Sequence, residues 1–111
     1  MDKIYKIKLS KNATYDIREL VDYIKNKLKE PNIAEQHREI IKEKILSLKQ
    51  YPSIYNVMDK EQVGIENLRK INVKNFMIFY QVFENDGIVR IIRVIYGKSN
   101  WKKELNETNE Q

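Results

Sequence analysis

The sequence predicts an α+β domain of order β-α-α-β-β-β, in which a helical hairpin packs on one face of a four-stranded antiparallel sheet and a short C-terminal helix follows. Apolar residues recur at steps of three and four over residues 13–48, with a break at Pro31-Asn32, which is typical of two amphipathic helices. Runs rich in β-branched and aromatic residues fill positions 68–96 and include the hairpin signal Asn85-Asp86-Gly87. A helical pair followed by successive strands favours helices gathered on one side of an antiparallel sheet.

The N-terminal third is expected to hold one strand and one helix. Residues 3–9 are rich in β-forming residues and partly alternate, so they predict the first strand. Ser10 or Asn12 is a suitable cap for the first helix, whose apolar stripe covers residues 13–28.

The second helix is expected to open at Asn32 and to end before Pro52. Asn32, with Glu35 three residues later, resembles a capping box, and proline cannot continue a helix. Residues 53–67 predict an irregular segment with a turn at Gly64.

The C-terminal half predicts three strands, over residues 68–73, 76–84 and 88–96. Ser99 or Asn100 is expected to cap a short helix that carries Trp101 and Leu105. We expect a single domain over residues 1–105, followed by a disordered tail at 106–111.

The third strand is apolar on both faces, whereas a sheet with helices on one side should alternate. Met77, Phe79 and Phe83 would lie on the face away from the hairpin. This outer face must be covered by the terminal helix, by a partner chain, or by both, and we infer a protein partner.

The charge of the chain is concentrated in its C-terminal sheet. Residues 68–103 carry eight Lys or Arg against two acidic residues, while the whole chain has a net charge of only +5. This excess favours an anionic partner, such as a nucleic acid. The chain has no cysteine, no signal-like N-terminus and no run long enough to span a membrane, so a cytoplasmic protein without a membrane partner is expected.

Metal chemistry is poorly supported, because one histidine, no cysteine and scattered carboxylates give no ligand spacing. His37 is the only imidazole, and it lies on the apolar stripe of the second helix between Ala34 and Ile41. That position predicts a packed histidine rather than a general base.

Three ordered motifs carry a family resemblance. They are AxxDIxxLxxYI at residues 13–24, LRxxxVxNFxIFYxV at residues 68–82 and VxIxRVIYG at residues 89–97. Together they resemble the RelE/ParE family of bacterial toxins over roughly residues 4–105. The resemblance implies the toxin half of a type II toxin–antitoxin module, neutralised by a cognate antitoxin and needing no cofactor. RelE-like members cut mRNA, usually in the ribosome and without a metal, whereas ParE-like members poison DNA gyrase.

In the RelE-like case, the resemblance implies that Arg69 and Arg93 bind the scissile phosphate, that Lys98 or Lys70 neutralises charge, and that Tyr96 donates or accepts a proton. The expected additional nucleic-acid contacts are Lys70, Lys74, Arg90, Lys102 and Lys103. The expected antitoxin contacts, for an acidic amphipathic segment, are Met77, Phe79, Phe83 and Trp101.

Several of these residues also have a structural interpretation. Arg93 lies among apolar residues and could pair with Asp16 or Asp22 on the first helix. Tyr96 at a strand end and Trp101 in the terminal helix are typical packing residues. Met77 stands where RelE-like nucleases carry an arginine, so the nuclease set is incomplete. A ParE-like inhibitor and a non-catalytic basic nucleic-acid-binding module therefore stay open as alternatives.

Overall fold

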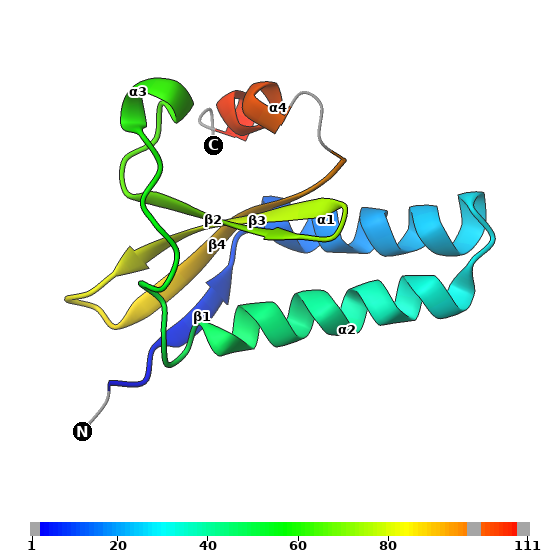
Figure 1. The fold of residues 1–111 in the computed structure, drawn as a ribbon, viewed down its shortest axis with the longest axis horizontal. Coiled ribbons are helices and arrows are strands. Elements are labelled where there is room, and N and C mark those ends of the chain that lie inside the picture. The colour runs from blue at the N-terminus through cyan, green and yellow to red at the C-terminus, as the bar shows by residue number, and fades with distance from the viewer. Residues whose placement is uncertain (1–2, 98–100, 109–111) are drawn as a thin grey trace.

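A computed structural model describes residues 3–97 and 101–108 of the chain, and its α+β architecture is the one that the sequence predicts (Figure 1). The elements are, in order, β1 (Lys6–Leu9), α1 (Lys11–Asp22), the π-helical turn η1 (Tyr23–Lys27), α2 (Pro31–Ser47), α3 (Lys60–Val63), β2 (Leu68–Val73), β3 (Phe76–Phe83), β4 (Ile88–Tyr96) and α4 (Trp101–Thr108). None of the described helices is both long enough and apolar enough to cross a membrane.

The sheet has the strand order β1-β4-β3-β2. β2, β3 and β4 are antiparallel neighbours as predicted, and Gly87, with a φ of 66°, lies in the turn between β3 and β4. β1 instead runs parallel to β4, with Lys6 opposite Ile88 and Leu9 opposite Ile91, so the sheet is mixed rather than wholly antiparallel. Both helices of the hairpin and two further strands separate β1 from β4 in the chain, so no local turn fixes their relative direction.

The helical hairpin covers one side of the sheet, which we call the inner face and which carries Ile71, Ile78 and Val89 (Figure 1). The predicted cap of α1 is confirmed, since Ser10 Oγ accepts a hydrogen bond of 2.9 Å from the backbone N–H of Ala13. The inner core also contains most of the predicted helix stripes, namely Ala13, Leu20, Ile24, Ala34, Ile41, Ile45 and Leu48, whereas Leu28 at the end of the first stripe is 47% exposed.

The start of α2 differs from the expected capping box at Asn32. The helix begins at Pro31 after Glu30, which makes no side-chain cap. Proline suits a first helical position, because its fixed φ is already helical and its missing N–H would have no partner there. The helix ends at Ser47, before Pro52.

The other side of the sheet, the outer face, is covered by α3 and α4 (Figure 1). A second core there joins Met77 and Phe79 of β3 to Leu105 of α4 and Val63 of α3. Of the covers that the sequence left open, the terminal helix is the one present. Met77 and Phe79 are 7% and 0% exposed, so this chain buries both of them, and their contact with an antitoxin stays a prediction.

The short helix α3 lies in the segment expected to be irregular, and Gly64 ends it in the left-handed region with a φ of 73°. α4 extends to Thr108 and so includes three residues of the expected tail. Residues 98–100, with the proposed caps Ser99 and Asn100, and residues 109–111 lie outside the described part of the chain.

Candidate functional site

Arg93, one of the two arginines expected to bind phosphate, is held in a structural ion pair. Its Nε and Nη2 donate to the two carboxylate oxygens of Asp16 at 2.6 and 2.9 Å, and its Nη1 donates to the backbone oxygen of Glu104 at 3.0 Å. The Arg93 and Asp16 side chains are only 15% and 10% exposed. Of the two partners left open by the sequence, the structure therefore selects Asp16, and the guanidinium ties α1 and α4 to β4.

Arg69, the other arginine, is bound to the backbone of the segment before β2. Its Nη1 donates to the carbonyl oxygens of Tyr55 and Ser53 at 2.5 and 3.3 Å, and Val57 pairs with Arg69 as an isolated bridge. The guanidinium thus fastens residues 53–57 against the edge of the sheet.

The two arginines belong to opposite faces of the sheet. Arg69 lies opposite Tyr80, whose side chain belongs to the inner core. A bulge shifts the β3–β4 register after Phe79, so that Phe79, of the outer core, lies opposite Arg93. Because directly paired residues project to the same face, Arg69 and Arg93 do not converge on one phosphate.

Tyr80 lies beside Arg69 and is the titratable group with a large pKa shift among the described residues. Its hydroxyl donates to the carbonyl oxygen of Pro52 at 2.6 Å. Burial raises the pKa of Tyr80 to about 12, against the opposing effect of the Arg69 charge. The Tyr80 phenol therefore stays neutral and hydrogen-bonded inside the core, where it holds the loop after α2 and does not transfer protons.

The expected catalytic set has two further members, Tyr96 and Lys98. Tyr96 is partly exposed at the end of β4, with its ring centroid 6.3 Å from that of Tyr23. This is the packing role that its position suggested. Lys98 lies outside the described residues.

Part of the expected nucleic-acid-binding set does gather, in a pocket of about 430 Å³ on the outer face. Lys70 and Lys74 line it with Asn72 and Trp101. Lys70 Nζ and Lys102 Nζ lie 4.7 and 5.5 Å from the ring centroid of Trp101. The described residues that line this pocket include no carboxylate, imidazole or phenol, so they can attract an anion but offer no acid–base pair.

Arg90 and Lys103 are exposed, and Arg90 lies opposite Gln81 on β3 and Lys8 on β1. The register therefore places Arg90 towards the opposite end of β4 from Trp101.

The residues expected to bind an antitoxin are mostly internal. The ring of Trp101 stacks on that of Phe79 with 5.6 Å between centroids, so Trp101 anchors α4 on the sheet. Phe83 alone of the four is exposed, at 39%. Contact of Met77 and Phe79 with a partner would require α4 to leave the outer face.

His37 is half-buried, with its Nδ1 3.0 Å from the backbone oxygen of Ile33 and its ring centroid 5.9 Å from that of Phe76. This is the packed position expected from the helix stripe. Among the described residues, no group of three or more His, Cys, Asp or Glu side chains could hold a metal ion.

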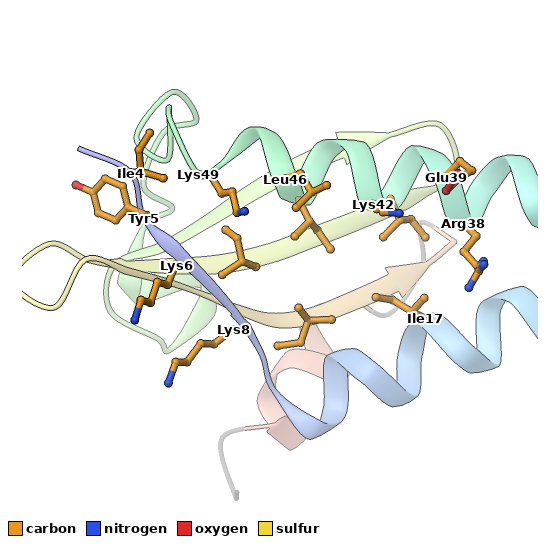
Figure 2. Close-up of a pocket in the computed structure, with 14 residues that line it drawn as sticks. Ile4, Tyr5, Lys6, Lys8, Ile17, Arg38, Glu39, Lys42, Leu46 and Lys49 are labelled. Atoms are coloured by element: carbon orange, nitrogen blue, oxygen red, sulfur yellow. The ribbon is translucent and has the colours of Figure 1, made fainter. Parts of the chain in front are cut away.

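A further concavity was not anticipated from the sequence. It is a groove of about 930 Å³ between β1 and the helical hairpin (Figure 2). Its apolar lining includes Ile7, Ile41 and Leu46, and lysines stand around it. The alternation of lysine with isoleucine or leucine over residues 6–9 was the available signal, but the sequence does not indicate that this strand lies at an edge.

A model of the protein family described as "ParE toxin of type II toxin-antitoxin system, parDE" matches residues 7–101. A search of curated proteins found no match.

Three solved structures illustrate the fold. The chromosomal ParDE system of P. aeruginosa matches with a TM-score of 0.69 and 16% identity, covering 86% of this chain and 98% of that chain. The isolated E. coli RelE toxin matches with a TM-score of 0.63 and 18% identity, over 96% and 99% of the two chains. The RelBE2 toxin–antitoxin complex of Mycobacterium tuberculosis matches with a TM-score of 0.59 and 15% identity, over 84% and 98%. At these identities the likeness concerns the fold.

Proposed function

Because this chain belongs to the ParE family and is the toxin of a type II toxin–antitoxin module, we propose that it arrests bacterial growth by binding and inhibiting DNA gyrase, without cutting RNA. The observation that carries the proposal is the engagement of both candidate phosphate-binding arginines. Arg69 holds the loop before β2 and Arg93 holds Asp16, on opposite faces of the sheet. A metal-free nuclease needs such cations converging on one phosphate.

The surface offered to gyrase is then expected on the helical hairpin or on the terminal segment. The hairpin presents exposed aromatic and aliphatic side chains that its own core does not use, namely Tyr15, Tyr23 and Leu28. Exposed aromatic residues of this kind are common anchors in protein interfaces. Both candidate targets, gyrase and the ribosome, are cytoplasmic, so the toxin is proposed to act in that compartment.

Cleavage of mRNA is the second candidate, and the lysines around Trp101 are the observation that favours it. Lys70, Lys74 and Lys102 would attract a polyanion, and an aromatic ring can stack on a base. In that case Lys70 or Lys98 would neutralise charge at the phosphate and Tyr96 would transfer the proton. A basic module that binds nucleic acid without toxicity is the third reading.

One pair of assays separates these functions. The purified toxin is added to gyrase with relaxed plasmid, and separately to a translation extract with a defined message. We expect supercoiling to be lost and the message to stay intact. Discrete cuts in the message with unimpaired supercoiling would replace the proposal with the nuclease. Salt-dependent binding of nucleic acid without either effect, and without growth arrest on expression, would indicate the binding module.

A further inference from the structure

Three cationic side chains share one end of the outer face. Lys8 of β1 pairs directly with Arg90 of β4, and directly paired residues project to the same face of a sheet. Val89 and Ile91, on either side of Arg90, belong to the inner core, so Arg90 and Lys8 lie on the outer face. Lys6 is two residues from Lys8 and projects to that face as well. We call Lys6, Lys8 and Arg90 the cationic row, and Figure 2 shows both lysines on the side of β1 away from α2.

The cationic row is open to solvent. The second core, which α3 and α4 cover, includes Phe79 and Ile95 of the sheet, whereas all three side chains of the row are exposed. Phe83 lies at the same end of the sheet, since it pairs with Ile88 and Ile88 pairs with Lys6, and it is 39% exposed. The two helices therefore leave this end of the outer face uncovered.

The positive charges of the row are not balanced by acidic side chains. None of the ion pairs found among the described residues includes a member of the row. The turn between β3 and β4 carries Glu84 and Asp86, but neither takes part in these pairs. Like charges directly opposite each other on neighbouring strands repel, as Lys8 and Arg90 do here. A bound anion would offset this repulsion, so the row is complementary to a polyanion.

We propose that the cationic row binds the phosphate backbone of duplex DNA, and that the toxin contacts through it the DNA that gyrase holds. The choice of DNA among polyanions rests on the proposed function, because gyrase acts on duplex DNA. Lysine and arginine side chains on the face of a sheet meet phosphate oxygens, which carry no sequence information. The contact therefore adds affinity for the gyrase–DNA complex without selecting a sequence. The register places the row at the opposite end of β4 from the pocket beside Trp101.

RNA and an acidic protein segment are the competing occupants. Single-stranded RNA is bound largely by stacking of its bases on aromatic rings, and Phe83 is an exposed ring beside the row. An acidic amphipathic segment requires apolar contacts in addition to charged ones. The row itself consists only of charged side chains, which favours contact with a phosphate backbone over stacking or apolar packing.

The first test measures how the full-length toxin binds a fluorescently labelled DNA duplex at several salt concentrations. It compares the wild type with one variant of the row and with a control that makes the same charge change at exposed positions of η1, namely K8Q/R90Q and K25Q/K27Q. Each phosphate contact contributes roughly 0.9 to the slope of log K against log salt. We expect K8Q/R90Q to reduce this slope by about two and to weaken binding roughly tenfold or more at low salt, and the control to stay within about twofold. K8Q/R90Q is expected to fold, since it changes exposed positions and removes a repulsive pair.

The second test compares the affinity of the toxin for gyrase alone and for gyrase bound to a DNA fragment. We expect the wild type to bind the DNA complex at least about fivefold more tightly than gyrase alone. K8Q/R90Q should lose this preference and bind both forms equally, within about twofold, while its affinity for gyrase alone stays that of the wild type. This result would locate the contact of the row on the DNA of the complex.

Several outcomes would overturn the proposal. One is an unchanged slope for K8Q/R90Q, and another is a slope that falls in K70Q/K74Q instead, which would place the DNA contact beside Trp101. Tighter binding of single-stranded RNA than of duplex DNA, lost in Phe83→Ser, would assign the row to RNA. Weaker binding of K8Q/R90Q to gyrase alone would assign the row to a protein surface.

Failure of the proposed function is distinguishable from failure of the row. Intact supercoiling in the presence of the wild-type toxin would contradict the inhibition of gyrase and, with it, the contact to gyrase-held DNA. The titration of free duplex contains no gyrase, so it decides by itself whether the cationic row binds DNA.

Discussion

Asp16 accepts a backbone hydrogen bond from β4 where β1 no longer pairs with that strand. β1 pairs with β4 only as far as Ile91, and beyond that point the backbone of β4 has no strand on this side. The carboxylate of Asp16 accepts the N–H of Val94 at 3.0 Å in addition to its two bonds with Arg93. One aspartate on α1 thus satisfies both a buried backbone donor and a buried guanidinium, and each would be costly to leave without a partner.

We expect the substitution Asp16→Ala to lower the free energy of unfolding by about 3 kcal/mol, because it removes the carboxylate that accepts from Nε and Nη2 of Arg93 and from the N–H of Val94. Urea denaturation measures the change. The matched control is Glu35→Ala, which removes the partner of Arg38 in a pair whose side chains are both 60% exposed. That change is expected to stay within about 0.5 kcal/mol. A loss below about 1 kcal/mol for Asp16→Ala would show that the ion pair with Arg93 contributes little to the stability of the fold.

Tyr80 gives a second residue-scale prediction, in the alkaline range. Its pKa rises from 10.0 to about 12 on folding, because burial disfavours the phenolate. The unfolded chain therefore releases this proton first, and the associated stability is complete below about pH 10 and is lost as the pH rises through 12. The Tyr80→Phe variant lacks this titration and also loses the bond to Pro52, at a cost of about 1 kcal/mol at neutral pH.

Urea denaturation at a series of pH values from about 8 to about 12 measures the free energy of unfolding and checks this expectation. The wild type should be the more stable protein at neutral pH, and its advantage over Tyr80→Phe should fall to zero and reverse as the pH rises from 10 towards 12, because the two-unit pKa shift outweighs the bond of about 1 kcal/mol. Tyr15→Phe is the control, since Tyr15 is 58% exposed and should behave like the wild type throughout. A constant difference between wild type and Tyr80→Phe would show that Tyr80 titrates normally.

At the scale of elements, α4 gives the outer face its cover. Leu105 is fully buried against that face and Trp101 stacks on Phe79, so a helix of eight residues closes the second core. An isolated helix of this length is unstable in water, so its helicity depends on these contacts. α4 is therefore expected to unfold locally once its anchor is lost.

Trp101 is the only tryptophan of the chain, and its fluorescence reports on the docking of α4. We expect Leu105→Asp to release the helix, because a charge in this core is too costly, and to shift the Trp101 emission to the red. Asn106→Asp adds the same charge at an exposed neighbouring position and should leave the emission unchanged. Equal spectra for the two variants would mean that α4 does not depend on Leu105.

The sequence predicts those elements whose evidence is local. The bounds of β2 and β4 and the turn at Gly87 agree with the structure, because alternation and turn chemistry act over a few residues. The parallel direction of β1, the bulge at Ile92 and the open groove depend on segments far apart in the chain. No pattern within one segment specifies them.

The candidate site also contains one contact that the sequence indicates and one that it does not. The Arg93–Asp16 pair could be foreseen as one of two alternatives, since a charged residue in an apolar strand requires a partner. The contact of Arg69 with the carbonyl oxygens of Ser53 and Tyr55 could not be foreseen, because the path of an irregular segment leaves no pattern in its sequence.

At the scale of the whole molecule, the sheet separates two cores, each sealed by its own helices (Figure 1). Two concavities lie on either side of the sheet. The groove at β1 faces the hairpin side, and the pocket beside Trp101 faces the side of α4. The two concavities therefore open on opposite sides of the sheet.

A nuclease is expected to use the pocket beside Trp101, since Lys70, Lys74 and Lys102 gather there. If the toxin acts on gyrase instead, the double variant K70A/K74A should still arrest growth on expression to within about twofold of the wild type. Removal of two phosphate-binding lysines from a nuclease would lower cleavage by at least roughly a hundredfold, since each loss of a charged contact to the transition state has a large effect on rate. Colony counts after induction measure the arrest, and the supercoiling assay on the same purified variant identifies the target. A folded K70A/K74A protein that no longer stops growth would place the active surface on the outer face and contradict the gyrase proposal.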